Sequence, residues 1–265
     1  DWMPRPGKRS GAYSNGGAFD VHPYQLLNFN GNYEDVSTCA HEAGHSMHSY
    51  LANKTQPYGL HDYSLFVAEV ASTLNENLLF HHALKQAKNK EEKLFLLGSY
   101  LEGLRTTLFR QTMLAEFELK VHQQAEQGQP LTGDSLNALY LELLRKYYGH
   151  EQGICTIDEL YAVEWAYIPH FYYNFYVYQY ATSLVASTNL ARAIREEAPA
   201  TTRRDAYLKM LSLGRSKTPI ELLKGAGVDM TTSQPFRTAM QEMNLVMDQI
   251  EELSGPGRNS AYKIP

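Results

Sequence analysis

The chain has 265 residues, 43% of them hydrophobic, and a formal net charge of −5. A chain of this length can bury the core of one large domain or of two small ones. Its acidic balance argues against nucleic acid as a partner, and no apolar run approaches the roughly 20 residues that span a membrane. Two cysteines cannot form a disulfide framework, so we expect a cytoplasmic protein.

The first 31 residues differ from the rest of the chain. SGAYSNGG and HPYQLLNFNG place aromatic and apolar residues between glycine, asparagine and proline, which predicts two short strands joined by a turn. Gly16 and Gly17 would permit a close backbone approach, although a tight turn explains them equally well. From Asn32 the pattern is helical, with Asn32 as a candidate N-cap and acidic residues in the first turn.

Helical periodicity accounts for most of the remaining sequence. The first helix should run to about residue 53, and a second is predicted over 64–87 with an apolar stripe at Phe66, Val70, Leu74 and Leu78. Further helices are predicted over 91–128, 133–149, 165–197, 201–214, 219–228 and 234–253. We therefore expect a mainly α protein with a small N-terminal antiparallel β element. One domain should cover residues 1–254, followed by a flexible tail over 255–265.

The segment HEAGH at 41–45 fits the pattern H-E-x-x-H. Residues four apart leave one face of a helix a turn apart, so His41 and His45 can bind one zinc ion. Glu42 lies about 100° round the helix from His41, where its carboxylate can take a proton from zinc-bound water. The pattern also occurs by chance. The sequence has no C-x-x-C, however, which argues against a closed structural zinc site.

A third ligand can come from the next helix, in FVAEVASTLNENLLF. Glu69 and Glu76 lie seven residues apart on its polar face, and antiparallel pairing of the two helices would carry one of them to the histidines. Two histidines and one glutamate leave a fourth position for water, as in catalytic zinc sites. Carboxylates on such a face are ordinarily just solvated, and the spacing does not choose between the two.

Other residues near the motif have competing roles. Asp35 and Glu76 could each accept a hydrogen bond from a ligand imidazole and fix its tautomer, although Asp35 also suits the start of a helix. His48 lies a turn beyond the metal, so we expect it to pack or to support a ligand. Cys39 is expected in the core.

Together these segments resemble the thimet-oligopeptidase family of zinc metallopeptidases, and more closely its bacterial branch, oligoendopeptidase F. The likeness extends to GKRSGAYS, FVAEVAST, HFYYNFYVYQYATS at 170–183 and PIELLKGAGVDM. It implies a zincin-like catalytic lobe in which Glu69 is the third zinc ligand and Glu76 a supporting residue. Ala43 replaces a phenylalanine common in the family. Family members are far longer, so the chain resembles their C-terminal catalytic portion.

The resemblance also implies an activity: zinc-dependent cleavage of internal bonds in short peptides, with Glu42 as general base. In the family a histidine and tyrosines of the matching segment face the substrate. Aligning YQYATS makes Tyr180 the best donor to the oxyanion, with His170, Tyr173 and Tyr178 as further candidates. The alternative for these aromatic residues is a place in the core. A free edge of the predicted strands could pair with an extended peptide.

Two other functions stay open. A zinc carboxypeptidase with the same ligands would need a cation for the substrate's terminal carboxylate, and Arg110 is the nearest candidate. A fragment without the N-terminal lobe could keep the metal and lack turnover. The sequence gives neither the peptide preference nor the oligomeric state.

Overall fold

The computed structural model describes residues 1–255. They divide into two compact units, one made of Asp1–Glu102 and the chain from Thr182, the other of Gly103–Ala181. The predicted tail lies outside the described residues, apart from Gly255, which caps the last helix with φ +83°. That residues 1–254 form one catalytic domain stays a prediction. Among the described helices, none combines the length and apolar character needed to cross a membrane.

The two predicted strands are present in the first unit. Strand β1 (Tyr13–Asn15) pairs antiparallel with β2 (Tyr24–Leu26). Gly16 follows β1 and lies against the first helix, where a Cβ atom would stand 2.2 Å from the Cβ of Ser49. The glycine is therefore explained by close packing of the strand against the helix.

Helix α1 (Tyr33–Thr55) carries the H-E-x-x-H segment and begins with a capping box. The side chain of Asn32 accepts a hydrogen bond from the backbone N–H of Asp35 at 2.9 Å, and the Asp35 carboxylate accepts one from the Asn32 N–H at 3.2 Å. Such a cap typically contributes about 1 kcal/mol. The predicted N-cap is confirmed.

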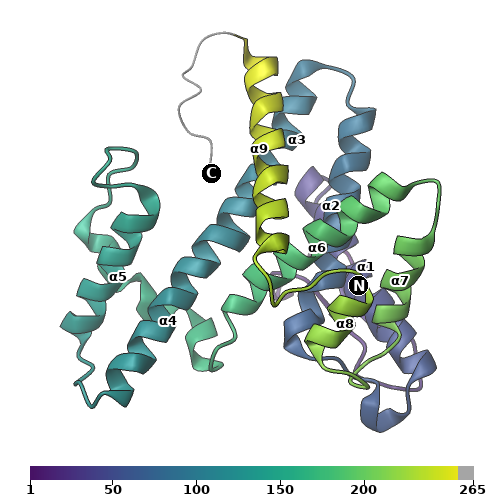
Figure 1. The fold of residues 1–265 in the computed structure, drawn as a ribbon, viewed down its shortest axis with the longest axis horizontal. Helices are drawn as coiled ribbons and strands as arrows, with labels where there is room; N and C mark the ends of the chain where they lie inside the picture. Colours follow the sequence, from purple (N-terminus) through teal and green to yellow (C-terminus); the bar gives the residue numbers. More distant parts are fainter. Residues whose placement is uncertain (256–265) are drawn as a thin grey trace. The chain divides into compact units, whose positions relative to one another are not determined.

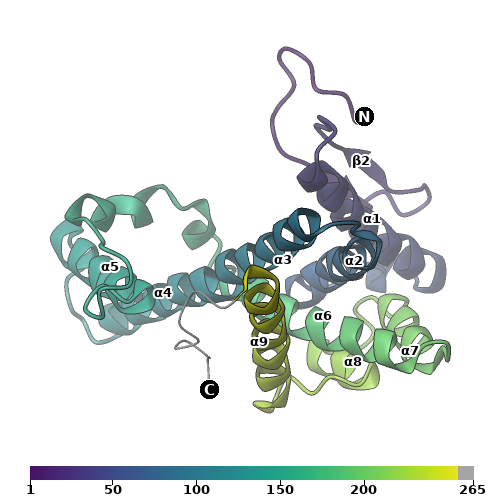
Figure 2. The same cartoon turned by 90° about the horizontal axis from the view of Figure 1, so that it is seen from above.

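Helix α2 (Leu65–Gln86) runs antiparallel to α1, and the two lie side by side (Figures 1 and 2). The amide of Asn75 donates to the Ala40 carbonyl at 3.1 Å, whereas Ser49, further along α1, meets the hydroxyl of Tyr63 just before α2 at 3.1 Å. Position along one helix thus rises as position along the other falls. This is the pairing that the metal hypothesis requires.

The core of the first unit forms around α2. Val70 and Leu74 of the predicted stripe are buried, whereas Phe66 and Leu78 are partly buried. They pack with α6 (Tyr178–Glu197), whose residues from Thr182 belong to this unit, and with α7 (Thr202–Leu211) and α8 (Pro219–Gly225). A second cluster joins α2 to α3 (Lys90–Leu104) and α9 (Gln234–Ser254). This packing holds α2, and thereby Glu69, in place.

The second unit is built around α4 (Gln111–Glu126) and α5 (Gly133–Tyr148). The helix predicted over 91–128 is interrupted, because a π-helical turn, η2 (Arg105–Arg110), separates α3 from α4. The core of this unit includes Met113, Phe117, Tyr140 and Leu143.

The helix predicted from residue 165 is wrong in its first part. Two 3-10 segments, η3 (Glu159–Tyr167) and η4 (Pro169–Tyr172), precede α6, which begins only at Tyr178. Proline at 169 has no N–H and disfavours helical geometry at Ile168, where ψ is 105°. Asn174 and Phe175 then take positive φ angles of 22° and 56°. The aromatic segment is therefore a sequence of turns.

Candidate metal centre

Three donor atoms converge between α1 and α2: the Nε2 atoms of His41 and His45, and Oε2 of Glu69. The two nitrogens are 3.1 Å apart, and the oxygen lies 3.3 Å from His41 Nε2 and 3.4 Å from His45 Nε2. A tetrahedral zinc site with bonds of 2.0–2.1 Å places its ligand atoms about 3.3 Å apart. The triangle therefore fits one such ion. Within residues 1–255 it is the one group of three or more histidine, cysteine or acidic side chains close enough to share a metal.

The convergence depends on a close approach of the two helices at Gly44. A Cβ atom there would lie 2.4 Å from the Ala71 carbonyl oxygen and 2.7 Å from the Ser72 Cα. The absent side chain lets α2 come close enough for Glu69 to reach both histidines. Sequence reasoning did not single out this residue, although a glycine inside a helix was a signal, because it weakens the helix by about 1 kcal/mol.

A neighbouring carboxylate orients the first ligand. His41 Nδ1 lies 2.8 Å from Glu76 Oε1, and donation by Nδ1–H leaves the Nε2 lone pair for a metal. The structure thus separates the two glutamates that spacing could not, with Glu69 in the donor triangle and Glu76 behind His41. Asp35 takes the competing role, since its carboxylate accepts from the backbone N–H groups of Asn30 and Asn32.

The donor cluster holds a proton strongly in the absence of a metal. Burial alone lowers the pKa of His41, but hydrogen bonds and charges from Glu69 and Glu76 outweigh it and raise the pKa to about 10. Burial raises the pKa of Glu69, yet hydrogen bonds from the two histidines bring it well below its ordinary value. A metal must displace this proton, so metal affinity should rise with pH.

Glu42 lies beside the donor triangle and is buried, with 6% of its surface exposed. The Ser14 backbone N–H donates to its carboxylate, whereas its Oε2 has no hydrogen-bond partner among the described residues. Burial raises the pKa of Glu42, and the charges of His41 and His45 oppose that rise. A carboxylate with a raised pKa and a free oxygen is suited to accept a proton.

The structure also shows the surroundings of two further residues of α1. The ring of His48 is buried and stacks on the Tyr63 ring with centroids 3.6 Å apart. Of the two roles expected for His48, the structure therefore shows packing. Cys39 is a free cysteine and only partly buried, so the structure does not place it in the core as expected.

A groove of about 660 Å³ in the first unit is lined by neighbours of the donor residues on both α1 and α2. Ser49, one turn after His45, and Ala68, next to Glu69, are among its lining residues. The other lining residues come from β1 and the glycines after it, from α1, from the segment before α2, from the first residue of α2 and from the loop after α7: Tyr13, Ser14, Asn15, Gly16, Gly17, Asn53, His61, Asp62, Tyr63, Leu65 and Arg215. Its volume is within the usual range for ligand sites.

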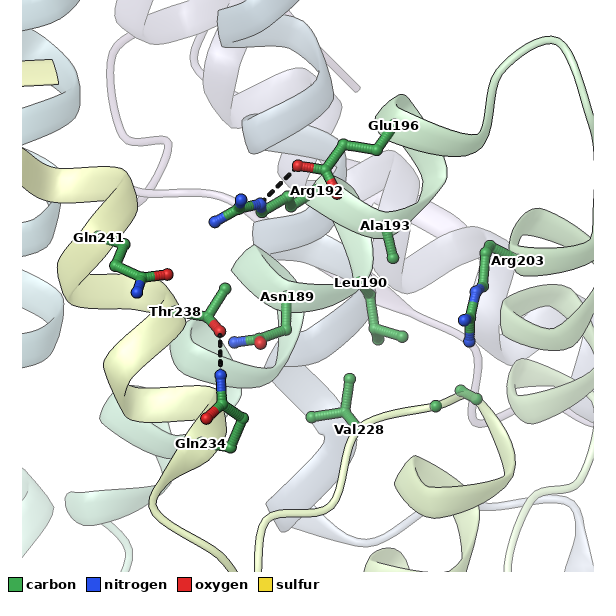
Figure 3. A pocket seen from close by; sticks show the side chains of 12 residues that line it. Asn189, Leu190, Arg192, Ala193, Glu196, Arg203, Val228, Gln234, Thr238 and Gln241 are labelled. Carbon is green, nitrogen blue, oxygen red and sulfur yellow. Dashed lines mark hydrogen bonds and ion pairs between the residues drawn. The ribbon is translucent and has the colours of Figure 1, made fainter. Parts of the chain in front are cut away.

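A second cavity of the first unit, about 320 Å³, lies between α6, α9 and the loop after α8 (Figure 3). Two pairs of its polar side chains bind one another, Arg192 with Glu196 at 2.7 Å and Gln234 with Thr238 at 3.5 Å. It contains none of the predicted site residues.

The aromatic residues predicted to contact substrate all belong to the second unit. Two of them, Tyr178 and Tyr180, lie at the start of α6, which continues into the first unit. Tyr176 and Tyr180 share a hydroxyl–hydroxyl hydrogen bond of 3.0 Å, and the His170 ring lies 5.8 Å and 5.6 Å from their rings. Tyr173 stands 6.1 Å from Tyr176 and is 68% exposed, so it is not a core residue. Tyr178 begins α6. Sequence reasoning did not select Tyr176, the centre of this cluster.

Arg110 does not present a free guanidinium. It forms a short ion pair with Glu164, whose other oxygen accepts the Tyr140 hydroxyl at 2.8 Å. Arg110, the candidate for binding a terminal carboxylate, is therefore already paired with a carboxylate of the protein itself.

The model of peptidase family M3 matches residues 1–242 of this chain. Oligopeptidase PepF of Bacillus subtilis is 46% identical over 254 residues, which are 96% of this chain and 37% of that protein. Group B oligopeptidase PepB of Streptococcus agalactiae is 43% identical over 95% of this chain and 41% of its own length. The chain therefore spans about two-fifths of the length of these relatives.

Solved structures agree with this match. Oligoendopeptidase-F from Enterococcus faecium is 38% identical, with a TM-score of 0.70 over 83% of this chain and 39% of that one. A crystal structure from Chlamydophila abortus is 46% identical, with a TM-score of 0.81 over 93% of this chain and 40% of its own. The mainly helical fold with its small sheet is thus shared with longer proteins.

Proposed function

Because this chain belongs to peptidase family M3, we propose that it is the catalytic portion of a zinc-dependent oligoendopeptidase that hydrolyses internal bonds of short peptides. The observation that carries the proposal is the triangle of His41, His45 and Glu69, whose donor atoms lie 3.1–3.4 Å apart. The names of the relatives, oligopeptidase and oligoendopeptidase, support the substrate class.

Zinc held by these three side chains would polarise the scissile carbonyl and lower the pKa of a coordinated water to about 7. The chain's own base would be Glu42, which accepts a proton from the attacking water and passes it to the departing amine. The hydrogen bond from the Ser14 N–H fixes this carboxylate, and burial raises its pKa so that it can hold the proton between the two steps. Glu76 would keep the His41 ring in its productive tautomer.

The remaining roles concern the substrate. The groove beside the donor triangle, about 660 Å³, would accept the peptide residues next to the scissile bond. Tyr180 stays the proposed donor to the oxyanion, with His170, Tyr173 and Tyr178 as substrate contacts, on the match of HFYYNFYVYQYATS with the family. One such donor is typically worth about 3–4 kcal/mol.

Cleavage of internally quenched peptides tests the proposal. We expect internal cleavage that a chelator abolishes and zinc restores. Glu42→Gln should keep stoichiometric zinc and lower kcat by roughly 10²–10⁴, as the loss of a general base does. Glu34→Gln, on the exposed first turn of α1, is the matched control and should cleave normally.

The other outcomes separate the alternatives. Release of single C-terminal residues would indicate a carboxypeptidase. Stoichiometric zinc without turnover would indicate a binding module that needs the rest of a longer protein. Cleavage that resists both the chelator and Glu42→Gln would refute the metal mechanism.

A further inference from the structure

The second unit contains a small aromatic cavity that the proposed mechanism does not use. It has a volume of about 180 Å³ and is lined by Phe117, Glu118, Val121, His122, Leu136, Trp165, Phe171 and Tyr172. The Phe117 ring lies 5.3 Å from that of Phe171 and 6.2 Å from that of Trp165, whereas Tyr172 is 81% exposed. The cavity thus has a packed aromatic wall and a rim open to solvent.

One wall of this cavity carries a buried acid. Glu118 is 4% exposed, and its Oε1 accepts the backbone N–H of Phe175 at 2.6 Å. Its Oε2 is buried and has no hydrogen-bond partner in the described part of the chain. Burying a carboxylate costs several kcal/mol unless a cation or several donors compensate it. Among the described residues, the one hydrogen bond from Phe175 compensates this charge only in part.

We propose that this cavity binds the side chain of a lysine or arginine from a peptide. The faces of aromatic rings attract a cation, the apolar wall accommodates the aliphatic stem, and the Glu118 carboxylate neutralises the charge. An anion would be repelled by Glu118, and a purely apolar group would leave its Oε2 without a partner. The volume suits one side chain and excludes a folded partner.

That the cation belongs to a peptide substrate rests on the proposed function. Phe171 and Tyr172 belong to η4, the same turn as His170, and Tyr173 follows directly. His170 and Tyr173 are proposed substrate contacts. A peptide that reaches them passes the rim of this cavity, which would then select a basic residue at one position of the substrate.

The cavity is also held in shape before a ligand arrives. Glu118 binds the N–H of Phe175, and the ring of His122, one turn along α4, lies 4.5 Å from the Phe175 ring. These contacts hold Phe175 at φ 56°, a conformation that costs a non-glycine residue of order 1 kcal/mol or more. A preformed site loses less free energy to ordering when it binds.

A lysine scan tests the proposal by binding alone. The probes are neutral heptapeptides that carry lysine at each position in turn, each matched with a norleucine peptide that has no charge. The protein is the full chain with Glu42→Gln, which prevents cleavage, and Trp2→Phe, which leaves Trp165 as the sole fluorophore of its kind. At one position we expect the lysine peptide to bind about tenfold more tightly and to change Trp165 emission.

Matched variants identify the charge responsible. Glu118→Gln keeps an acceptor for the Phe175 N–H but removes the charge, and it should reduce the lysine preference to about twofold or less. Glu116→Gln is the control, because Glu116 lies on the same helix, pairs with Lys146 and does not line the cavity. Tyr172→Ala removes a ring that is 81% exposed, and should also weaken lysine binding.

The proposal is overturned if no position prefers lysine, or if the preference survives Glu118→Gln with circular dichroism showing a folded variant. Should Glu118→Gln unfold, Tyr172→Ala decides, and an unchanged preference there overturns the proposal. Cleavage is not measured, so the two proposals fail separately. A chain that prefers lysine but never hydrolyses a peptide would contradict only the proposed function.

Discussion

His48 links the protonation of one residue to the stability of the metal-free fold. Its ring is fully buried against Tyr63, and burial lowers its pKa from 6.5 to about 3. Between these values the unfolded chain binds a proton that the folded chain does not. The stability that the neutral ring contributes is therefore complete above pH 6.5 and is lost as pH falls toward 3.

We predict that His48→Phe flattens the acid limb of the stability curve. The phenyl ring can still stack on Tyr63, but it cannot take up a proton. Between about pH 4 and 6, the free energy of unfolding of the metal-free protein should fall less steeply, by up to about 1.4 kcal/mol per pH unit. Urea unfolding at several pH values measures this free energy. His82→Gln, at an exposed position, is the control. The prediction would be contradicted if the free energy of unfolding fell equally steeply with pH in the unaltered protein, His48→Phe and His82→Gln.

Residues of the candidate site differ in how far the sequence could predict them. The spacing of His41 and His45 needs only a helix, so the pattern was sufficient. The choice of Glu69 over Glu76 needed the register between two helices, which the resemblance supplied and spacing did not. Tyr176 was missed because nothing local distinguishes it among seven tyrosines at positions 161–183. Glu118 was missed because its contact with Phe175 spans 57 positions.

At the scale of elements, local signals in the sequence predicted most helices. They failed where a contact with a residue distant in the sequence determines the backbone conformation. Asn32 marked the start of α1 through a capping box made of adjacent residues. Residues 165–177 have helical apolar spacing, yet they form turns, and Pro169 is the local signal against a continuous helix. The positive φ angles at Asn174 and Phe175 are held from α4, and no pattern within the segment contains that information.

The approach of α1 to α2 provides a test at the same scale. We predict that Gly44→Ala forces the helices apart, because its Cβ would lie 2.4 Å from the Ala71 carbonyl oxygen. The strain should lower the free energy of unfolding by about 1–3 kcal/mol. Displacing Glu69 from the two histidines should weaken zinc binding roughly 10–100-fold, the range that disturbed ligand orientation produces. Competition with a chromophoric chelator measures this affinity.

Gly98 provides the matched control for this prediction. It lies within α3, where an added Cβ would meet nothing within 4 Å. Gly98→Ala should leave zinc affinity unchanged and stabilise the helix by up to about 1 kcal/mol. Equal zinc affinity in Gly44→Ala and Gly98→Ala would show that the close approach does not set the donor triangle.

At the scale of the whole molecule, the predicted roles divide between the two units. The first unit contains every proposed metal ligand, Glu42, Glu76 and the groove, whereas the second contains His170, Tyr173 and the aromatic cavity. Metal binding should therefore be a property of one unit. The chain spans about two-fifths of its relatives' length, so peptide turnover can depend on more than these two units, whereas all three proposed metal ligands lie in the first unit.

This division predicts where zinc stabilises the protein. A ligand that binds only the folded state adds about 2.7 kcal/mol of stability at a hundred times its Kd. Because the donors come from α1 and α2, hydrogen exchange should slow on zinc addition in these helices and stay unchanged in α4 and α5 of the second unit. Glu69→Ala, which removes the proposed zinc ligand that α2 contributes, should abolish the effect. Equal protection in α4 and α5, or protection that persists in Glu69→Ala, would contradict a metal site confined to the first unit.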